Sequence, residues 1–221
     1  MNGEMRIVED VTSAFAQTVV EAFAGRPDPT FSLCLSGGPT ARKCYERLAA
    51  DGAESIDWWD VDIYWGDERC VPPDSPDSNE RLVRESLLER VGAANSVYPM
   101  RADEGPEPYQ LRLGDVGAFD LIHLGLGPDG HTASLFPNSA ALDADPGRLV
   151  VLNTDPSGLN PFVRMTLTYS AIARSRLAVF TVAGASKRDV LSKIMAGEEL
   201  PAARVTAQKV LWLVQEDAYP E

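Results

Sequence analysis

The sequence predicts an α/β protein, a Rossmann-like three-layer sandwich in which helices cover both faces of a mainly parallel sheet. Short apolar runs of strand length alternate with longer segments whose apolar residues recur at helical spacing. Such alternation is typical of parallel strands joined by crossover helices. Neither an internal repeat nor a polar linker divides the chain. We therefore expect residues 1–221 to form a single domain.

The first half of the chain contains three predicted strands, each followed by a predicted helix. The strands are residues 5–8, 31–35 and 61–65. The first helix opens at Asp10 and carries apolar residues at positions 11, 15, 19 and 23, which share one face. The second helix follows a glycine-rich turn at Ser36. The third is predicted from the capping-box spacing of Asp77 and Glu80, and it ends at Gly92.

The second half is predicted to be richer in strands. Residues 100–113 are polar and contain proline, which favours a loop with at most a short helix near Tyr109. The predicted strands are residues 121–124, 149–152, 163–167, 177–182 and 210–214. Ser186 and Asp189 have capping-box spacing, so a helix is expected from there to about Gly197.

Composition and charge exclude several classes of protein. A formal charge of −13 argues against a nucleic-acid partner, whose phosphates require a basic face. It leaves room for a small anionic substrate held by a few local cations, and the acidity itself favours solubility. No apolar run is long enough to cross a membrane, and the first ten residues lack a secretory pattern.

The three cysteines, Cys34, Cys44 and Cys70, cannot all pair, and none forms a Cys-x-x-Cys motif. Together with the missing secretory pattern, they favour a reducing cytoplasm and no structural zinc. The sequence leaves the oligomeric state open, and a monomer is compatible with it.

The stretch from Asp120 to Asn138 contains the strongest chemical pattern. The apolar residues 121–124 run directly into a bend rich in glycine, where Asp129 and His131 stand one residue apart. Loops at the carboxyl ends of strands commonly bind ligands in α/β proteins. His131 is therefore a candidate general base, and Asp129 is a candidate to orient its ring or hold a substrate hydroxyl. The alternative is a tight turn in which Asp129 caps a short helix and His131 lies at the surface.

A second candidate site follows the strand 31–35. Ser36, Gly37, Gly38, Pro39 and Thr40 form a glycine-rich turn before a helix. Backbone N–H groups at a helix N-terminus favour an anion such as phosphate, and Ser36 and Thr40 add hydroxyls. The alternative is an ordinary turn with Thr40 as the N-cap.

Several charged residues also follow predicted strands. Asp67, Glu68 and Arg69 come after residues 61–65, where they either bind a substrate or form a surface ion-pair cluster. Arg164 is suited to a bidentate phosphate contact, and Lys187 near a helix start is more favourable when an anion is bound. The remaining histidine, His123, lies within an apolar strand and is expected to be a packed, hydrogen-bonded core residue.

With these stretches in view, the chain resembles the 6-phosphogluconolactonase family, within a larger group that includes glucosamine-6-phosphate deaminase. The central match is the run from Gly125 to Pro137, G-L-G-P-D-G-H-T-A-S-L-F-P. Further matches follow the same order along the chain: Ser36-Gly37-Gly38, Asp67-Glu68-Arg69, Asp77-Ser78-Asn79, Arg164 to Thr168, Gly184 to Lys187, and Leu200-Pro201-Ala202. The likeness covers nearly the whole chain.

The resemblance implies hydrolysis of a small phosphorylated sugar lactone, 6-phospho-glucono-1,5-lactone, to 6-phosphogluconate in the oxidative pentose phosphate pathway, with no metal or cofactor. By position, His131 would activate water, assisted by Asp129 and Arg69. Ser36, Gly37, Gly38, Arg164 and Lys187 would hold the phosphate and sugar. Thr40, through its hydroxyl, and Asp67, through its carboxylate, are further substrate-binding candidates from their own positions. One departure is Pro39, where family members usually carry Gly or Ser, because proline offers no N–H to an anion. It can instead occupy the first helical position.

Two other functions are compatible with the same residues. One is a sugar-phosphate deaminase or isomerase, which would share the phosphate site but remove a carbon-bound proton. The other is a non-catalytic sugar-phosphate sensor, although binding alone does not require His131 and Asp129. Phe136 stands where the deaminases carry an acid-base glutamate, and this favours the lactonase.

Overall fold

The computed structural model describes residues 1–52 and 54–220, and its larger sheet has the parallel architecture that the sequence predicts. Seven strands lie in the order β1-β10-β9-β6-β2-β3-β5, and every neighbouring pair is parallel. They are β1 (Glu4–Val8), β2 (Phe31–Leu35), β3 (Val61–Trp65), β5 (Ser96–Tyr98), β6 (Leu121–Gly125), β9 (Leu177–Val182) and β10 (Lys209–Gln215).

The strand order reverses between β2 and β6. From β2 the chain adds β3 and β5 on one side, whereas β6, β9 and β10 follow one another on the other side. Because all seven strands are parallel, their carboxyl ends meet at one edge of the sheet. The loops leaving β2 and β6 diverge there, which is the position at which open α/β sheets bind ligands.

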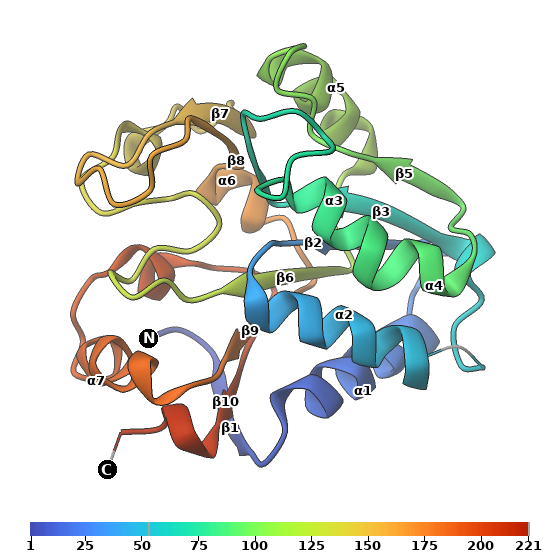
Figure 1. Cartoon of the computed structure of the whole chain (residues 1–221), viewed down its shortest axis with the longest axis horizontal. Helices are drawn as coiled ribbons and strands as arrows, with labels where there is room; N and C mark the ends of the chain where they lie inside the picture. The colour runs from blue at the N-terminus through green and yellow to red at the C-terminus, as the bar shows by residue number, and fades with distance from the viewer. Residues whose placement is uncertain (53, 221) are drawn as a thin grey trace.

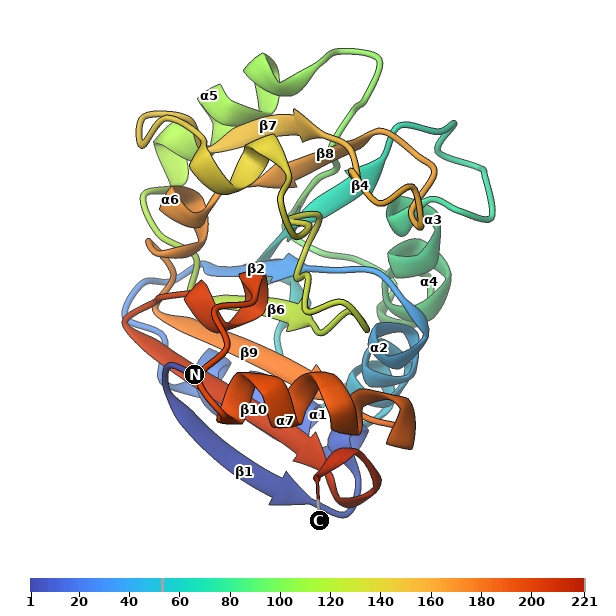
Figure 2. The same ribbon diagram turned by 90° about the vertical axis from the view of Figure 1, so that its left-hand side faces the viewer.

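Helices cover both faces of the sheet, as Figures 1 and 2 show, and the predicted three-layer sandwich is confirmed. One side carries α1 (Val11–Ala24), α2 (Pro39–Asp51), α3 (Asn79–Val83), a π-helical segment (Arg84–Leu88) and α4 (Glu89–Val91). The other side carries α5 (Pro106–Val116), α6 (Tyr169–Ile172) and α7 (Arg188–Met195). Asp10 caps α1 as predicted, accepting from the backbone N–H of Thr12.

A second, antiparallel sheet of three strands departs from the prediction of one sheet. It contains β4 (Asp67–Arg69), β8 (Arg164–Leu167) and β7 (Val150–Asn153), in that order. The sequence predicts the last two as strands of the main sheet and treats residues 67–69 as a loop. The chain leaves the main sheet at Gly66, whose N–H donates to Leu35 O and whose carbonyl accepts from Leu167 N.

Other local predictions are wrong in instructive ways. Residues 106–116 form a full helix where the sequence predicts a loop with at most a short helix near Tyr109, and the sequence does not predict β5 or α6. Ser78, one residue after the predicted Asp77, caps α3. The capping box at Ser186 does not form, because residues 185–187 make a 3₁₀ turn and α7 begins at Arg188.

Two chain-wide features concern the cysteines and the helices. The three cysteines are all unbridged. Across residues 1–52 and 54–220, each helix is too short or too polar to cross a membrane.

Candidate active site

A cavity of about 250 Å³ opens at the point where the strand order reverses. It brings together nearly all of the residues that the sequence singles out. The predicted residues that line it are Ser36, Gly37, Gly38, Thr40, Asp67, Arg69, His131, Arg164 and Lys187. Asp129 stands behind this wall, where it contacts His131.

The loop after β6 is a tight turn closed by its own backbone. Gly127 N donates to His131 O (2.8 Å), and Gly130 N donates to Gly127 O (3.1 Å). A Cβ at residue 127 would lie 2.2 Å from Nδ1 of His131, so only glycine lets the ring pack there. Asp129 lies within this turn and does not cap a helix, so that alternative is wrong.

His131 and Asp129 form a hydrogen-bonded pair. Nδ1 of His131 donates to Oδ1 of Asp129 at 2.5 Å, and the His131 backbone N–H donates to the same oxygen at 3.2 Å. Burial raises the pKa of Asp129, but the hydrogen bond and charge of His131, with backbone hydrogen bonds, outweigh it and lower the pKa overall. Asp129 is therefore ionised at neutral pH. A carboxylate at Nδ1 keeps the proton there and leaves Nε2 with a free lone pair.

The glycine-rich turn after β2 is held from two sides. Gly38 (φ 104°) is the N-cap of α2, and Pro39 occupies the first helical turn, so the alternative with Thr40 as N-cap is wrong. A Cβ on Gly37 would come within 1.8 Å of the Asn79 amide oxygen. Glycine thus lets Asn79 pack directly against the turn. Within the described residues, the buried Ser36 Oγ has no hydrogen-bond partner, and it lines the cavity.

Two arginines face the cavity from neighbouring strands of the small sheet. Arg69 on β4 and Arg164 on β8 stand directly opposite each other in the antiparallel register. In each, Nε is buried and lacks a partner among residues 1–52 and 54–220. Burial lowers the pKa of Arg164, Asp67 opposes this shift, and the charge of Arg69 adds to it. Two adjacent guanidinium groups with unused Nε donors favour a ligand that carries negative charge.

The two acids of β4 have different surroundings, and both are buried. Asp67 accepts from Ser134 Oγ (2.6 Å) and from Asn79 Nδ2 (3.2 Å), so it joins β4 to the loop that carries His131. Glu68 accepts from the backbone N–H groups of Asn79 (2.8 Å) and Glu80 (2.7 Å), at the start of α3. The alternative of a surface ion-pair cluster is wrong for these carboxylates.

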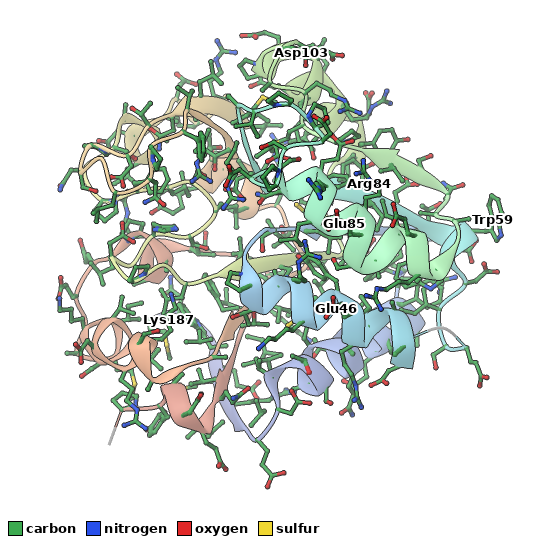
Figure 3. The ribbon with its side chains drawn as sticks, viewed as in Figure 1. Glu46, Trp59, Arg84, Glu85, Asp103 and Lys187 are labelled. Atoms are coloured by element: carbon green, nitrogen blue, oxygen red, sulfur yellow. The ribbon has the colours of Figure 1, made fainter. Side chains whose placement is uncertain are left out.

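The remaining cation, Lys187, ends the 3₁₀ turn before α7 (Figure 3) and lines the cavity. Burial lowers its pKa, and the charge of Asp129 partly offsets this. Arg164 and Lys187 are far apart in sequence and belong to different elements, and both line this cavity.

Comparison with known proteins decides the family. The model of the family described as glucosamine-6-phosphate isomerases/6-phosphogluconolactonase matches residues 3–212. The chain belongs to this family.

A 6-phosphogluconolactonase of Synechocystis is 36% identical, with 96% of this chain and 92% of the relative covered. The crystal structure of 6-phosphogluconolactonase from Thermotoga maritima has a TM-score of 0.85 at 30% identity, covering 96% of this chain and 99% of that one. A monomeric glucosamine-6-phosphate deaminase also superposes (TM-score 0.81, 17% identity, 99% of this chain and 98% of that one), which indicates the fold alone. The fold of this family therefore does not separate the two activities.

Two residues that line the cavity, Asn79 and Asn160, are not among the site residues that the sequence predicts. Asn79 belongs to a stretch that matches the family, and it contacts Gly37 and Asp67 and accepts from Arg69 Nη1 at 2.7 Å. Asn160, in an irregular loop, also lines the cavity. Its position carried no signal, because the loop approaches the site only through the pairing of β7 with β8. His123 is packed and hydrogen-bonded as predicted, and it also lies at the cavity wall.

Proposed function

We propose that this protein hydrolyses 6-phospho-glucono-1,5-lactone to 6-phosphogluconate, with His131 as the base that activates water. Membership of the family and the names of the relatives above support a lactonase. The observation that carries the proposal is the Asp129–His131 pair at a cavity lined by Arg69 and Arg164, whose Nε groups have no partner in the part of the chain that the structure describes. A general base beside an anion site is what hydrolysis of a phosphorylated lactone requires.

The proposed reaction has two steps. Nε2 of His131 takes a proton from water as the water oxygen attacks the lactone carbonyl. Arg69 stabilises the oxyanion that forms. The intermediate then collapses with cleavage of the bond between the carbonyl carbon and the ring oxygen, which receives the proton from His131. Asp129, ionised and bonded to Nδ1, stabilises the imidazolium between the two steps.

The substrate phosphate is assigned to the turn after β2 together with Arg164 and Lys187. Ser36, Gly37 and Gly38 supply small groups at the start of α2, where the helix dipole favours negative charge. Holding the phosphate orients the carbonyl toward His131. Because the oxygens of Asp67 already accept from Ser134 and Asn79, we assign Asp67 mainly to positioning the catalytic loop.

Phe136 supports the lactonase over a deaminase. Its ring packs against His131 with 5.0 Å between centroids, and it is buried. A phenyl ring cannot transfer a proton, so the second acid-base group that a deaminase uses at this position is missing. One base and one water suffice for opening a lactone.

The test is turnover of freshly prepared lactone by wild type and by His131→Ala, corrected for spontaneous hydrolysis. Loss of a general base is expected to lower kcat by about 100- to 10,000-fold. Binding of 6-phosphogluconate, measured by calorimetry, should remain. Activity of the variant within a few-fold of wild type would exclude His131 as the base.

A further inference from the structure

Two residues that line the cavity belong to a row of three hydrogen-bonded side chains, Thr181, His123 and Tyr45. Thr181 on β9 and His123 on β6 line the cavity, with exposed fractions of 4% and 0%. His123 Nε2 lies 2.8 Å from Thr181 Oγ1, and its Nδ1 lies 2.8 Å from the hydroxyl of Tyr45 on α2. The Tyr45 hydroxyl in turn accepts from Ser36 N (2.8 Å) and donates to Ser36 O (2.9 Å).

The number of protons available to these three side chains determines the tautomer of His123. Tyr45 has a single hydroxyl proton, which cannot serve both Ser36 O and His123 Nδ1 well. When Tyr45 donates its hydroxyl proton to Ser36 O and Nδ1 of His123 carries a proton, all four contacts become hydrogen bonds. With the phenol proton directed to Nδ1 instead, the buried Ser36 carbonyl faces only oxygen lone pairs. The first arrangement satisfies more buried polar groups and is therefore favoured.

This tautomer determines what Thr181 presents to the cavity. Nε2 of His123 has no proton, so the Thr181 hydroxyl donates to it and keeps its lone pairs. Burial lowers the pKa of His123 to about 3, so the ring is neutral at neutral pH. The nearby thiol of Cys44, whose pKa burial raises to about 12, stays protonated and is at most a weak donor to Thr181. A lone pair of Thr181 thus remains for a ligand.

We propose that Thr181 is a substrate-binding residue whose hydroxyl oxygen accepts a hydrogen bond from a hydroxyl group of the sugar, with His123 fixing its orientation. The inference rests on the proposed function, because it takes the ligand to be a hydroxylated sugar phosphate. Tyr45 connects this contact to Ser36, so the sugar-binding wall and the turn assigned to phosphate are held in one arrangement. A ligand that has the phosphate but lacks hydroxyl groups would not use Thr181.

The test compares Thr181→Val, which removes the hydroxyl but keeps the branched shape, with Thr181→Ser, which keeps the hydroxyl. Loss of one neutral hydrogen bond should lower kcat/KM for the lactone by about 2- to 12-fold in Thr181→Val. Binding of 6-phosphogluconate should weaken by a similar factor, while inhibition by inorganic phosphate stays the same. Thr181→Ser should recover most of the loss. Unchanged kcat/KM in Thr181→Val, or equal weakening of phosphate and 6-phosphogluconate, would overturn the proposal.

Nitrogen NMR of the wild type provides an independent test that needs no variant. The chain has two histidines, so His123 can be assigned by comparison with His131→Ala. We expect a protonated Nδ1 and an unprotonated Nε2 on His123 from pH 5 to 8, and a protonated Nε2 would overturn the proposal. A different result would exclude the proposed function. If the wild type binds 6-phosphogluconate through Thr181 but does not hydrolyse the lactone, the proposed reaction is wrong while the Thr181 contact is retained.

Discussion

Replacing Asp129 by asparagine removes one negative charge beside His131 and little else. The amide oxygen can still accept from Nδ1 and from the backbone N–H of His131, the two bonds that the carboxylate accepts now. A hydrogen bond to a charged acceptor contributes about 1 to 1.5 kcal/mol more than a neutral one. Since 1.36 kcal/mol corresponds to a factor of ten, kcat should fall about 5- to 13-fold. If the amide group turns and donates to Nδ1, the proton moves to Nε2 and the loss approaches that of His131→Ala.

The assay is a double-mutant cycle on lactone hydrolysis. It uses wild type, Asp129→Asn, His131→Ala and the double variant, each corrected for spontaneous hydrolysis. Asp129 is bonded to His131 and stands behind the residues that line the cavity, so its charge should act on kcat through the imidazole. Its interaction with Lys187 concerns phosphate binding and should change KM instead. Asp129→Asn should then change kcat by less than about twofold in the His131→Ala background.

Two results would refute this reasoning. Equal losses in both backgrounds would mean that Asp129 acts on the substrate directly. Wild-type kcat in Asp129→Asn would mean that the charge contributes nothing. Thermal melting of the four proteins is the control, because a damaged turn would lower the melting temperature as well as kcat.

Three further predictions concern the anion site, the choice of reaction and stability. Charge reversal of Arg164 or Lys187 should weaken 6-phosphogluconate binding strongly and gluconate binding hardly at all, measured by calorimetry; equal losses would assign these residues to the fold. Since Phe136 cannot transfer a proton, wild type should release no ammonia from glucosamine 6-phosphate, and release above a His131→Ala control would contradict the lactonase assignment. Asp10 caps α1, and hydrogen bonds from Thr12 and Ser13 lower its pKa to about 2. Asp10→Ala should lower the free energy of unfolding by about 0.5 to 2 kcal/mol at pH 7. The carboxylate stabilises only while ionised, so this difference should shrink as the pH falls from about 4 to 2, and a constant difference in denaturant titrations would contradict the role of its charge.

Local patterns in the sequence determine the parallel sheet and the location of the site. The bounds of β2, β3 and β9 match the predicted runs, because buried strands of a parallel sheet are largely apolar and are followed by glycine or polar residues. The turns after residues 35 and 125 were identified for the same reason. Gly127 is required within its own turn, by close packing against His131, whereas Gly37 makes room for Asn79 of α3. Because β2 and β6 are parallel, both turns lie at the same edge of the sheet.

Only the tertiary structure decides how charged and polar residues pair across that edge. Arg69 meets Arg164 because β4 and β8 form a second sheet, and no periodicity distinguishes strands of that sheet from strands of the first. The burial of Glu68 and the hydrogen bond from Ser134 to Asp67 likewise depend on which elements become neighbours. Thr181, His123 and Tyr45 come from three separate elements, and each reads in sequence as ordinary core. The spacing of a residue in the sequence predicts the face of the helix or strand on which it lies. The topology of the fold determines which other residues it contacts. The arginine Nε groups that face this cavity therefore come together only in the folded protein.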